Sequence, residues 1–355
     1  MTNPARRRLL VLATLALGLS TTSPLRAQDQ TELSVLTYNI EGLPWPARGG
    51  RRDDLSRIAD QLQALRADGR QPHVVLFEEA FSRDARAIAH KAGYRYIVDG
   101  PSASDTKSVA GIADRAFHAA ARFFAGEKIG KWQSSGLRIA SDYPIVDVKR
   151  MAYGVCAGMD CLANKGAVLV TVSVPGVVQP VAIVDTHLNS RHASRVSDDR
   201  SFYAYQRQVD ALSDFVRANV QPGTPFIVAG DFNAQGGRRR DYLLQQAALW
   251  RSDAPVRAAL DLCLNAGDQC PTDNRQDLMF SQRRGRDYQL FASGGTTNIA
   301  LKSMAALFGH DADGHMLSDH VGYTATYRIG DMAPLSASSL ANTAPVRLAS
   351  GSASR

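Results

Sequence analysis

Polar residues follow a strand-like apolar run near the middle of this chain. Residues 226–229 are apolar, lie between Pro225 and Gly230, and are followed by Asp231 and Asn233, which predicts a short buried strand with a polar end. Residues two apart on an extended chain point the same way, so this carboxylate and amide oxygen can aim at one point. Oxygen donors of that kind suit a hard divalent cation. Taken alone, the motif is more often a strand that ends in an Asx-type turn.

The same arrangement recurs along the chain, which favours a functional site over a set of unrelated turns. Polar residues next to the ends of predicted strands are Asn39, Glu79, His187, Asn189, Asp231, Asn233, Asp277, Asp319 and His320. Carboxylates and amides with two histidines, and no Ser or Cys nucleophile motif, predict metal-assisted hydrolysis by water. The reason is that Mg²⁺ binds a few carboxylates together with phosphate oxygens of a substrate.

The apolar patterns predict strands and helices in alternation, and these elements would position the polar residues. Strands are predicted over 33–40, 73–77, 94–98, 137–140, 145–148, 167–174, 181–187, 226–229, 276–280 and 321–328, and helices over 53–65, 82–92, 201–219 and 241–249. Residues 106–131 have helical spacing and predict either a core helix or a lid over the site. With 355 residues, of which 45% are hydrophobic, one large α/β domain is expected.

The N-terminal segment predicts export. Arg6, Arg7 and Arg8 precede an apolar run over 9–19 that is too short to span a bilayer, and Ala27 offers a small-residue cleavage site, an order typical of a secretory signal at residues 1–27. The arginines also resemble a twin-arginine signal, so the export route stays open. We expect a secreted or periplasmic catalytic domain over 28–330, followed by a disordered tail over 331–355 rich in Ser, Ala, Thr and Pro.

Net charge argues mildly against a nucleic-acid partner. Residues 1–27 hold four arginines and no acids, so their removal lowers the formal charge from +7 to +3. Binding to a nucleic-acid backbone depends on several cations that release counterions. Residues 238–240 are three arginines, which form either a local basic patch or a solvated loop.

Four cysteines in an exported chain suggest two disulfides. Cys156 and Cys161 are close in sequence, as are Cys263 and Cys270, and these two pairings are favoured among the three possible connectivities. A zinc site is the less favoured alternative, because no histidines stand nearby at ligand spacing.

Six short motifs, taken in order, carry a resemblance to a known superfamily. They are Thr-Tyr-Asn at 37–39, Phe-Glu-Glu at 77–79, Asp-Thr-His-Leu at 185–188, Gly-Asp-Phe-Asn at 230–233, Gln-Asp at 276–277 and Ser-Asp-His at 318–320. Together they resemble the endonuclease/exonuclease/phosphatase superfamily over residues 33–328. The resemblance implies an α/β fold of one domain, a four-layer α/β/β/α sandwich of two mixed sheets flanked by helices. It also implies in-line attack of water on a phosphorus ester.

The resemblance also implies roles for individual residues. Glu79 would hold Mg²⁺ with help from Asn39, and Mn²⁺ or Co²⁺ could substitute. His320 would be the general base and Asp231 the acid for the leaving oxygen. His187 and Asn233 would hold the phosphoryl oxygens, and Asp277 or Asp319 would orient and charge-stabilise His320. Glu78 stands where the superfamily more often has Asn or Gln, which adds an acid beside the metal ligand.

A further motif bears on the substrate. Asn164, Lys165 and Gly166 resemble the Asn-Lys-Gly segment of bacterial neutral sphingomyelinases, although inositol-polyphosphate phosphatases carry a similar one. A lysine on a glycine-flanked turn can offer its charge and nearby N–H groups to a phosphate. Asn164, Lys165 and Asn189 are therefore predicted to bind substrate, and the favoured activity is cleavage of sphingomyelin to ceramide and phosphocholine.

Other activities remain open on the sequence alone. A secreted nuclease and a phosphoinositide or inositol-phosphate phosphatase would use the same fold, and a catalytically inactive lipid-binding module would bind without turnover. The expected partner is a membrane lipid at a bilayer surface, and no protein partner is inferred. Two apolar stretches, 43–46 and 299–308, are candidate membrane anchors. The second is equally compatible with a core helix.

Overall fold

The computed structural model describes residues 31–43, 48–105 and 114–331. The signal peptide predicted at 1–27, most of the apolar stretch 43–46, and the tail predicted at 331–355, apart from its first residue, lie outside the described residues. No helix in the described part is long and apolar enough to cross a membrane.

The described strands form two mixed sheets. The first has the order β10-β12-β13-β1-β2-β4-β3, in which β1 and β2 are parallel and most other pairs are antiparallel. Its strands are β1 (Thr31–Asn39), β2 (Val74–Glu78), β3 (Tyr96–Asp99), β4 (Arg138–Ser141), β10 (Thr272–Asp273), β12 (Thr297–Phe308) and β13 (Gly322–Asp331).

The second sheet has the order β5-β6-β7-β8-β11-β9, with β7 and β8 parallel and β11 antiparallel to β8. Its strands are β5 (Ile145–Ala152), β6 (Gly166–Val172), β7 (Val181–His187), β8 (Phe226–Asp231), β9 (Arg257–Ala258) and β11 (Asp287–Ala292). The two sheets therefore each present parallel strands whose carboxyl ends can meet at one edge of the molecule.

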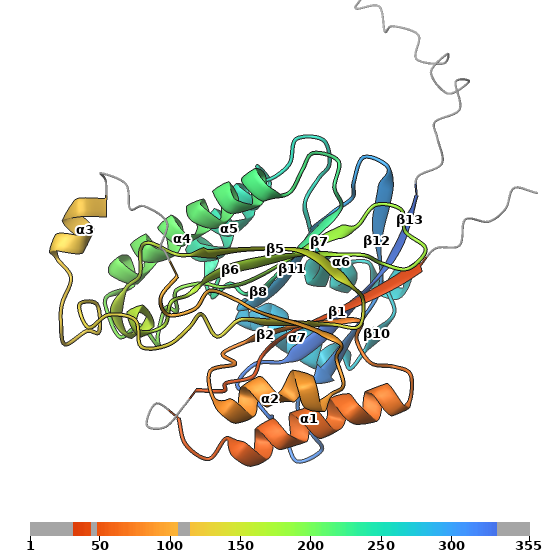
Figure 1. Cartoon of the computed structure of the whole chain (residues 1–355), viewed down its shortest axis with the longest axis horizontal. Helices are drawn as coiled ribbons and strands as arrows, with labels where there is room; N and C mark the ends of the chain where they lie inside the picture. Colours follow the sequence, from red (N-terminus) through yellow and green to blue (C-terminus); the bar gives the residue numbers. More distant parts are fainter. Residues whose placement is uncertain (1–30, 44–47, 106–113, 332–355) are drawn as a thin grey trace, which may run out of the picture.

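Helices cover the outer face of each sheet. α1 (Arg52–Ala67) and α2 (Arg83–Lys91) pack on the first sheet, and α4 (Asp198–Asn219) and α5 (Gly237–Ala247) on the second. The remaining described helices are α3 (Arg115–Ala119), α6 (Ala259–Asn265) and α7 (Arg275–Arg284), with 3₁₀ turns at Gly158–Leu162 and Gly267–Gln269. The helix, sheet, sheet, helix order confirms the four-layer sandwich expected from the sequence (Figure 1).

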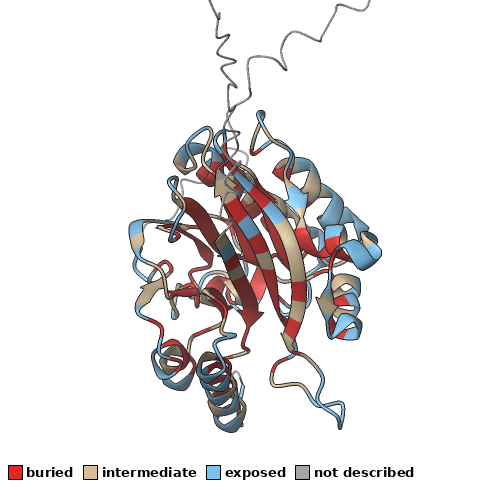
Figure 2. Ribbon diagram, turned by 90° about the vertical axis from the view of Figure 1, so that its right-hand side faces the viewer, coloured by how far each residue is buried: buried red, intermediate tan, exposed pale blue. Residues whose placement is uncertain are grey.

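Period-two alternation decides which side chains face the other sheet. In β8, Ile227 and Ala229 join the core between the sheets, whereas Phe226 and Val228 pack under the helices. Asp231 continues the inward set, because side chains two apart on a strand share a face. β1, β2 and β7 alternate in the same way, and Figure 2 shows the strands as the most buried part of the molecule. The inward face therefore turns from apolar to polar where these strands end.

Two sequence predictions of secondary structure are wrong. Residues 276–280 lie in helix α7 and not in a strand. Residues 299–308 are neither a core helix nor a free membrane anchor, because they form β12, which pairs with β13 along almost its whole length. Phe308 is 3% exposed and stacks on Tyr38 with ring centroids 4.7 Å apart, and Leu307 is half-buried.

The burial of Phe308 leads to a prediction about the free energy of unfolding. Replacing Phe308 by Ser should lower the free energy of unfolding by about 3–5 kcal/mol, because truncating a buried Phe loses its apolar burial and leaves a cavity. Chemical denaturation would measure the change. Leu249→Ser, at a side chain that is 62% exposed, is the matched control and should change stability little. Wild-type stability in Phe308→Ser would restore the anchor interpretation of this stretch.

The segment predicted as a core helix or a lid over 106–131 is mostly irregular where it is described. Residues 106–113 lie outside the described part, α3 covers only Arg115–Ala119, and turns follow. Phe117 packs against the small cluster of Val155, Ala157 and Ala204, but Phe124 is 97% exposed, so the segment is not a core helix.

Candidate active site

A small polar cavity of about 170 Å³ lies where the strand ends of the two sheets meet. It is lined by Glu79, Asp160, Lys165, His187, Ser190, His192, Ala193, Asp231, Asn233, Gln235, Arg286, Asp319 and His320. Seven of these residues are among those predicted from the sequence. A cavity this size is smaller than the pockets that hold drug-sized ligands and suits a compact polar group.

Asp231 lies at the centre of the cavity. One oxygen, Oδ1, accepts from the backbone N–H of Asn233 at 2.9 Å, and Oδ2 accepts from the Asn39 amide at 3.0 Å. His187 Nε2 and His320 Nε2 lie 3.4 and 3.7 Å from Oδ2. Burial raises the pKa of Asp231, with the Asp287 carboxylate adding to it and His320 opposing it. The end of β1, the end of β7 and the residues just before β13 thus meet at the carboxyl group that ends β8.

His320 is held by a residue that the sequence analysis missed. Its Nδ1 lies 2.9 Å from both carboxylate oxygens of Asp287, so Nε2 is the ring nitrogen turned to the cavity. Burial alone would lower the pKa of His320, but the Asp287 and Asp231 carboxylates outweigh burial and raise the pKa to about 9. The buried pair therefore fixes the ring and favours its protonated form.

The prediction that Asp277 orients His320 is wrong. Asp277 lies on α7, where its oxygens bind His310 Nδ1 at 2.5 Å and the Asn274 amide at 2.9 Å. It does not line the cavity. The helix that replaces the predicted strand carries this acid to a different part of the molecule.

Asp319, the second predicted partner of His320, lies at the cavity mouth. Its side chain is 50% exposed, binds Arg286 at 2.7 Å, and lies 3.8 Å from His320 Nε2. Arg286 Nη1 also lies 3.1 Å from His320 Nε2. Asp319 therefore adds negative charge near the ring and does not fix its orientation.

Lys165 and His187 form the basic side of the cavity. Lys165 Nζ lies 2.9 Å from His187 Nε2 and 3.1 Å from Asp160 Oδ1, and it donates to the Leu188 carbonyl at 3.0 Å. Burial lowers the pKa of His187 well below its usual value, and the neighbouring Lys165 charge adds to this. His187 is therefore neutral beside a lysine, an arrangement able to contact an anionic oxygen.

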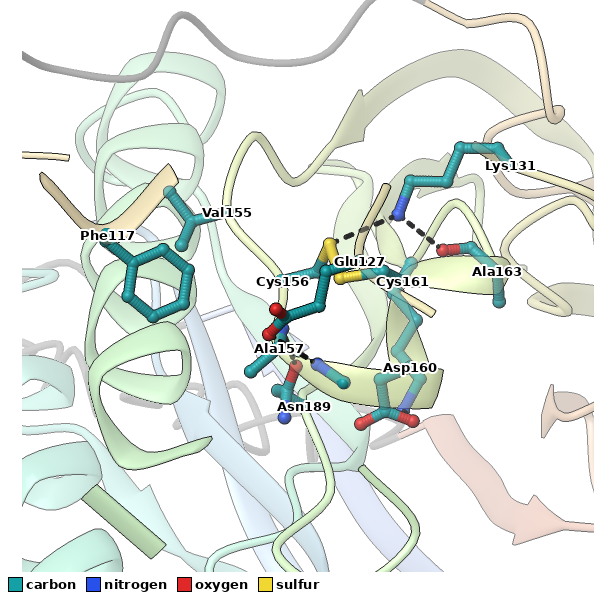
Figure 3. Close-up of a disulfide and its surroundings, with 12 residues drawn as sticks. Phe117, Glu127, Lys131, Val155, Cys156, Ala157, Asp160, Cys161, Ala163 and Asn189 are labelled. Carbon is teal, nitrogen blue, oxygen red and sulfur yellow. Dashed lines mark hydrogen bonds and ion pairs between the residues drawn. A yellow bond between two sulfur atoms is a disulfide. The ribbon is translucent and has the colours of Figure 1, made fainter. Parts of the chain in front are cut away.

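Asn189 and Asn164 do not line the cavity, contrary to the prediction that they bind substrate. Asn189 Oδ1 accepts from the Ala157 N–H at 2.9 Å, beside the disulfide between Cys156 and Cys161 (Figure 3). Asn164 Nδ2 donates to the Ser102 carbonyl at 2.7 Å. Both amides position loops next to the site. The second disulfide joins Cys263 and Cys270, so the structure has both favoured pairings.

Two site residues occupy the left-handed backbone region. Glu79 has φ 57° and Asn233 has φ 47°, a conformation that is uncommon for residues other than glycine and clusters at functional sites. After β2, this turn brings Glu79 to the cavity, whereas Glu78 points between the sheets. Burial raises the pKa of Glu79 to about 7, against the opposing effects of Lys165 and an Asn39 hydrogen bond.

Glu78 takes no part in lining the cavity. It is fully buried, its Oε1 accepts from Thr37 at 3.1 Å, and its pKa is raised well above the usual range by burial and by the facing Asp185. Two buried carboxyl groups side by side cannot both be charged without a large desolvation cost, which favours a shared proton.

The donor set fits a divalent cation. Four carboxyl groups line the cavity, at Glu79, Asp160, Asp231 and Asp319, against the two cations Lys165 and Arg286. Asp231, Asp287 and His320 also offer ligand atoms within 4.8 Å of one another, but Asp287 already pairs with His320 on both oxygens. Glu79 lines the cavity with the Asn39 amide beside it, so these two oxygen ligands form a candidate cation position.

The chain has recognisable relatives. Residues 36–320 match the Endonuclease/Exonuclease/phosphatase family. A stretch of 185 residues is 30% identical to human sphingomyelin phosphodiesterase 3 and covers 45% of this chain. The match spans only 28% of the length of that curated relative.

Solved structures share the fold at low sequence identity. A mutant of beta toxin from Staphylococcus aureus, crystallised with bound magnesium ions, has a TM-score of 0.56 at 17% identity, covering 83% of this chain and 99% of that one. Sphingomyelinase C from Streptomyces griseocarneus has a TM-score of 0.55 at 17% identity, covering 83% of this chain and 99% of that one. At this identity the likeness shows the fold, and the chemistry has to be argued from the cavity.

Proposed function

Because this chain belongs to the Endonuclease/Exonuclease/phosphatase family, we propose that it is an exported, Mg²⁺-dependent phosphodiesterase that hydrolyses sphingomyelin to ceramide and phosphocholine. The observation that carries the proposal is the buried pair of His320 and Asp287, whose imidazole lines one small polar cavity together with Asp231 and Glu79. Such a cavity would provide an oriented base, an acid and a cation position around one phosphorus centre.

The cation position is assigned to Glu79 with Asn39. A bound Mg²⁺ would neutralise charge on the phosphoryl and leaving oxygens. Within the chain, Lys165, His187 and Asn233 would contact the remaining phosphoryl oxygens, since all three line the cavity. A lysine beside a neutral imidazole provides a charge and a hydrogen-bonding nitrogen for an anion.

His320 would take the proton of the attacking water at Nε2, while Asp287 holds Nδ1. Water oxygen forms a bond to phosphorus as the bond from phosphorus to the ceramide oxygen breaks, and Asp231 would supply the proton that the departing oxygen takes up. The raised pKa of Asp231 favours the protonated form that this role needs. Positive charge beside Glu79 would offset the negative charge of the carboxylates that keep His320 protonated. It would therefore favour the neutral imidazole that a general base requires.

The proposed substrate and the proposed export of the chain are supported by different observations. The sphingomyelin head group is proposed from the sequence match to a sphingomyelin phosphodiesterase. Export is proposed from the residue pattern of the N-terminus, and the two disulfides support an oxidising compartment.

A substrate panel tests the proposal. The protein would be incubated with Mg²⁺ and sphingomyelin vesicles, supercoiled plasmid, or inositol polyphosphates, and the products measured as phosphocholine, nicked DNA and free phosphate. We expect phosphocholine to be the main product. Plasmid nicking or phosphate release without phosphocholine would replace the proposed substrate with a nucleic acid or an inositol phosphate. Binding to vesicles without any product would indicate an inactive lipid-binding module.

A further inference from the structure

Three large aromatic side chains are exposed on one loop of the molecule. We define the aromatic loop as residues 121–133. In it, Phe123 is 58% exposed, Phe124 is 97% exposed and Trp132 is 69% exposed. The rings of Phe123 and Phe124 meet edge to face with centroids 5.7 Å apart. Folded proteins rarely leave large apolar side chains together in water, and such patches mark interaction surfaces.

The aromatic loop is held in place by a buried carboxylate. The side chain of Glu127 is 2% exposed and binds Arg200 on α4 at 2.5 Å. It also accepts from the backbone N–H groups of Gly158 at 3.0 Å and Arg122 at 2.7 Å. Just before the loop, Phe117 on α3 stacks on Tyr203 of α4 with centroids 4.8 Å apart. The exposed rings therefore stand on a fixed support.

The aromatic loop is also hydrogen-bonded to residues next to the catalytic cavity. The Trp132 N–H donates to the Leu162 carbonyl at 2.8 Å. Lys131 donates to the Ala163 carbonyl at 2.8 Å (Figure 3). Both carbonyls follow the segment closed by the disulfide from Cys156 to Cys161. That segment carries Asp160, which lines the cavity and pairs with Lys165. The aromatic loop is therefore tied directly to one wall of the site.

The location and the charge of this region suit a membrane. Figure 1 shows α3 and the chain after it projecting from the end of the molecule opposite the start of β1 and the end of β13. Residues 115–132 contain four cations, Arg115, Arg122, Lys128 and Lys131, and one acid, the paired Glu127. Aromatic rings with exposed basic residues around them match the interface of a bilayer, where rings enter the head-group layer and cations meet lipid phosphates.

We propose that the aromatic loop is a membrane-docking surface, which inserts Phe123, Phe124 and Trp132 into the bilayer interface and places the cavity at the level of the lipid head groups. The partner is a lipid surface, and the proposal rests on the proposed function in taking the substrate to be a bilayer lipid. It assigns the docking role to a part of the chain different from both apolar stretches named from the sequence.

Vesicle sedimentation tests the proposal without depending on turnover. The full chain would be mixed, in the presence of chelator, with vesicles of phosphatidylcholine and phosphatidylserine that contain no sphingomyelin. The double change Phe123→Ser and Phe124→Ser should weaken binding about tenfold or more, because moving one Phe out of water contributes on the order of tenfold in affinity. Val178→Ser is the matched control, since Val178 is 85% exposed and follows Pro175, which binds Thr31 at the far end of β1. It should leave vesicle binding unchanged.

A second readout separates docking from catalysis. In the double variant, the rate on sphingomyelin vesicles should fall relative to the rate on a soluble phosphocholine ester, with an unchanged melting temperature. Equal vesicle binding by wild type and variant, or no vesicle binding by wild type, would overturn the docking proposal even if sphingomyelin is hydrolysed. Vesicle binding that depends on the two rings, without release of phosphocholine from any substrate, would support docking and contradict the proposed function. A dimer in lipid-free sedimentation that is lost in the double variant, without vesicle binding, would identify a second copy as the occupant and overturn the lipid assignment.

Discussion

Replacing His320 by Ala is expected to lower kcat for phosphodiester hydrolysis by about 10²–10⁴-fold, with a much smaller change in KM. The ring is buried, its Nδ1 is fixed by Asp287 at 2.9 Å, and its Nε2 faces the cavity beside Asp231. A group that moves a proton only as the reaction proceeds contributes to the transition state and little to substrate binding. Steady-state kinetics on a soluble phosphocholine ester would measure both constants.

Two carboxylate variants test how the base is positioned. Asp287→Asn should lower kcat strongly, because the ring loses the anion that fixes Nδ1 and favours its charged form. It should also lower the pKa of His320, which titration by NMR would detect. Asp277→Asn is the matched control, since Asp277 binds His310, and its kcat should stay near wild type. A large loss in Asp277→Asn with a normal rate in Asp287→Asn would reverse our assignment.

Replacing Glu79 by Gln is expected to remove activity by roughly 10³-fold. Cation stabilisation of transition-state charge contributes several kcal/mol, and each 1.36 kcal/mol corresponds to a factor of ten. Glu79 reaches the cavity through a left-handed turn directly after β2, and Gln keeps its size while removing its charge. The loss should therefore come from cation binding and not from misfolding.

Cation binding can be measured apart from turnover. A ligand that binds only the folded state raises the melting temperature, so Mg²⁺ should raise it in wild type and much less in Glu79→Gln. Glu32→Gln is the matched control, because Glu32 pairs with Lys302 on the surface at the start of β1, and it should keep the wild-type shift. An equal Mg²⁺ shift in Glu79→Gln would place the cation elsewhere, with the cluster of Asp231, Asp287 and His320 as the next candidate.

The sequence predicted the strands that end in site residues because their patterns are strong and local. The apolar run before Asp231 is closed by Pro225 and Gly230, and β8 lies over the same residues and two more. Alternation then places Asp231 with Ile227 and Ala229 on the face between the sheets. The same reasoning brings His187 to the cavity and Asn39 to the Asp231 carboxylate, so parallel strands could be assembled into a site from their carboxyl ends alone.

Asp287 was missed because no strand was predicted over residues 287–292, so no polar residue was sought at its start. Asp287 begins β11, which runs antiparallel to β8 and places Asp287 in register with Asp231. The run of Leu290, Phe291 and Ala292 after Gly285 was the available signal for this strand.

Other differences come from tertiary contacts that local patterns do not contain. Residues 299–308 lack a strict strand alternation, and β12 has register shifts at Leu301/Ser303 and Ala306/Phe308 that break the period of two. Asn164 and Asn189 have the residue type of a substrate ligand, but their amides are used by backbone groups of nearby loops. Whether a polar side chain faces a ligand or a loop depends on neighbours distant in sequence.

Hydrolysis of sphingomyelin vesicles in ¹⁸O-labelled water is the most direct test of the central claim, which is attack of water on the phosphorus of a phosphocholine lipid. With Mg²⁺ present, mass spectrometry should find one ¹⁸O atom in the phosphocholine released and none in the ceramide, and chelator should abolish both products. Absence of phosphocholine, label in the ceramide hydroxyl, or undiminished release with chelator would contradict the account.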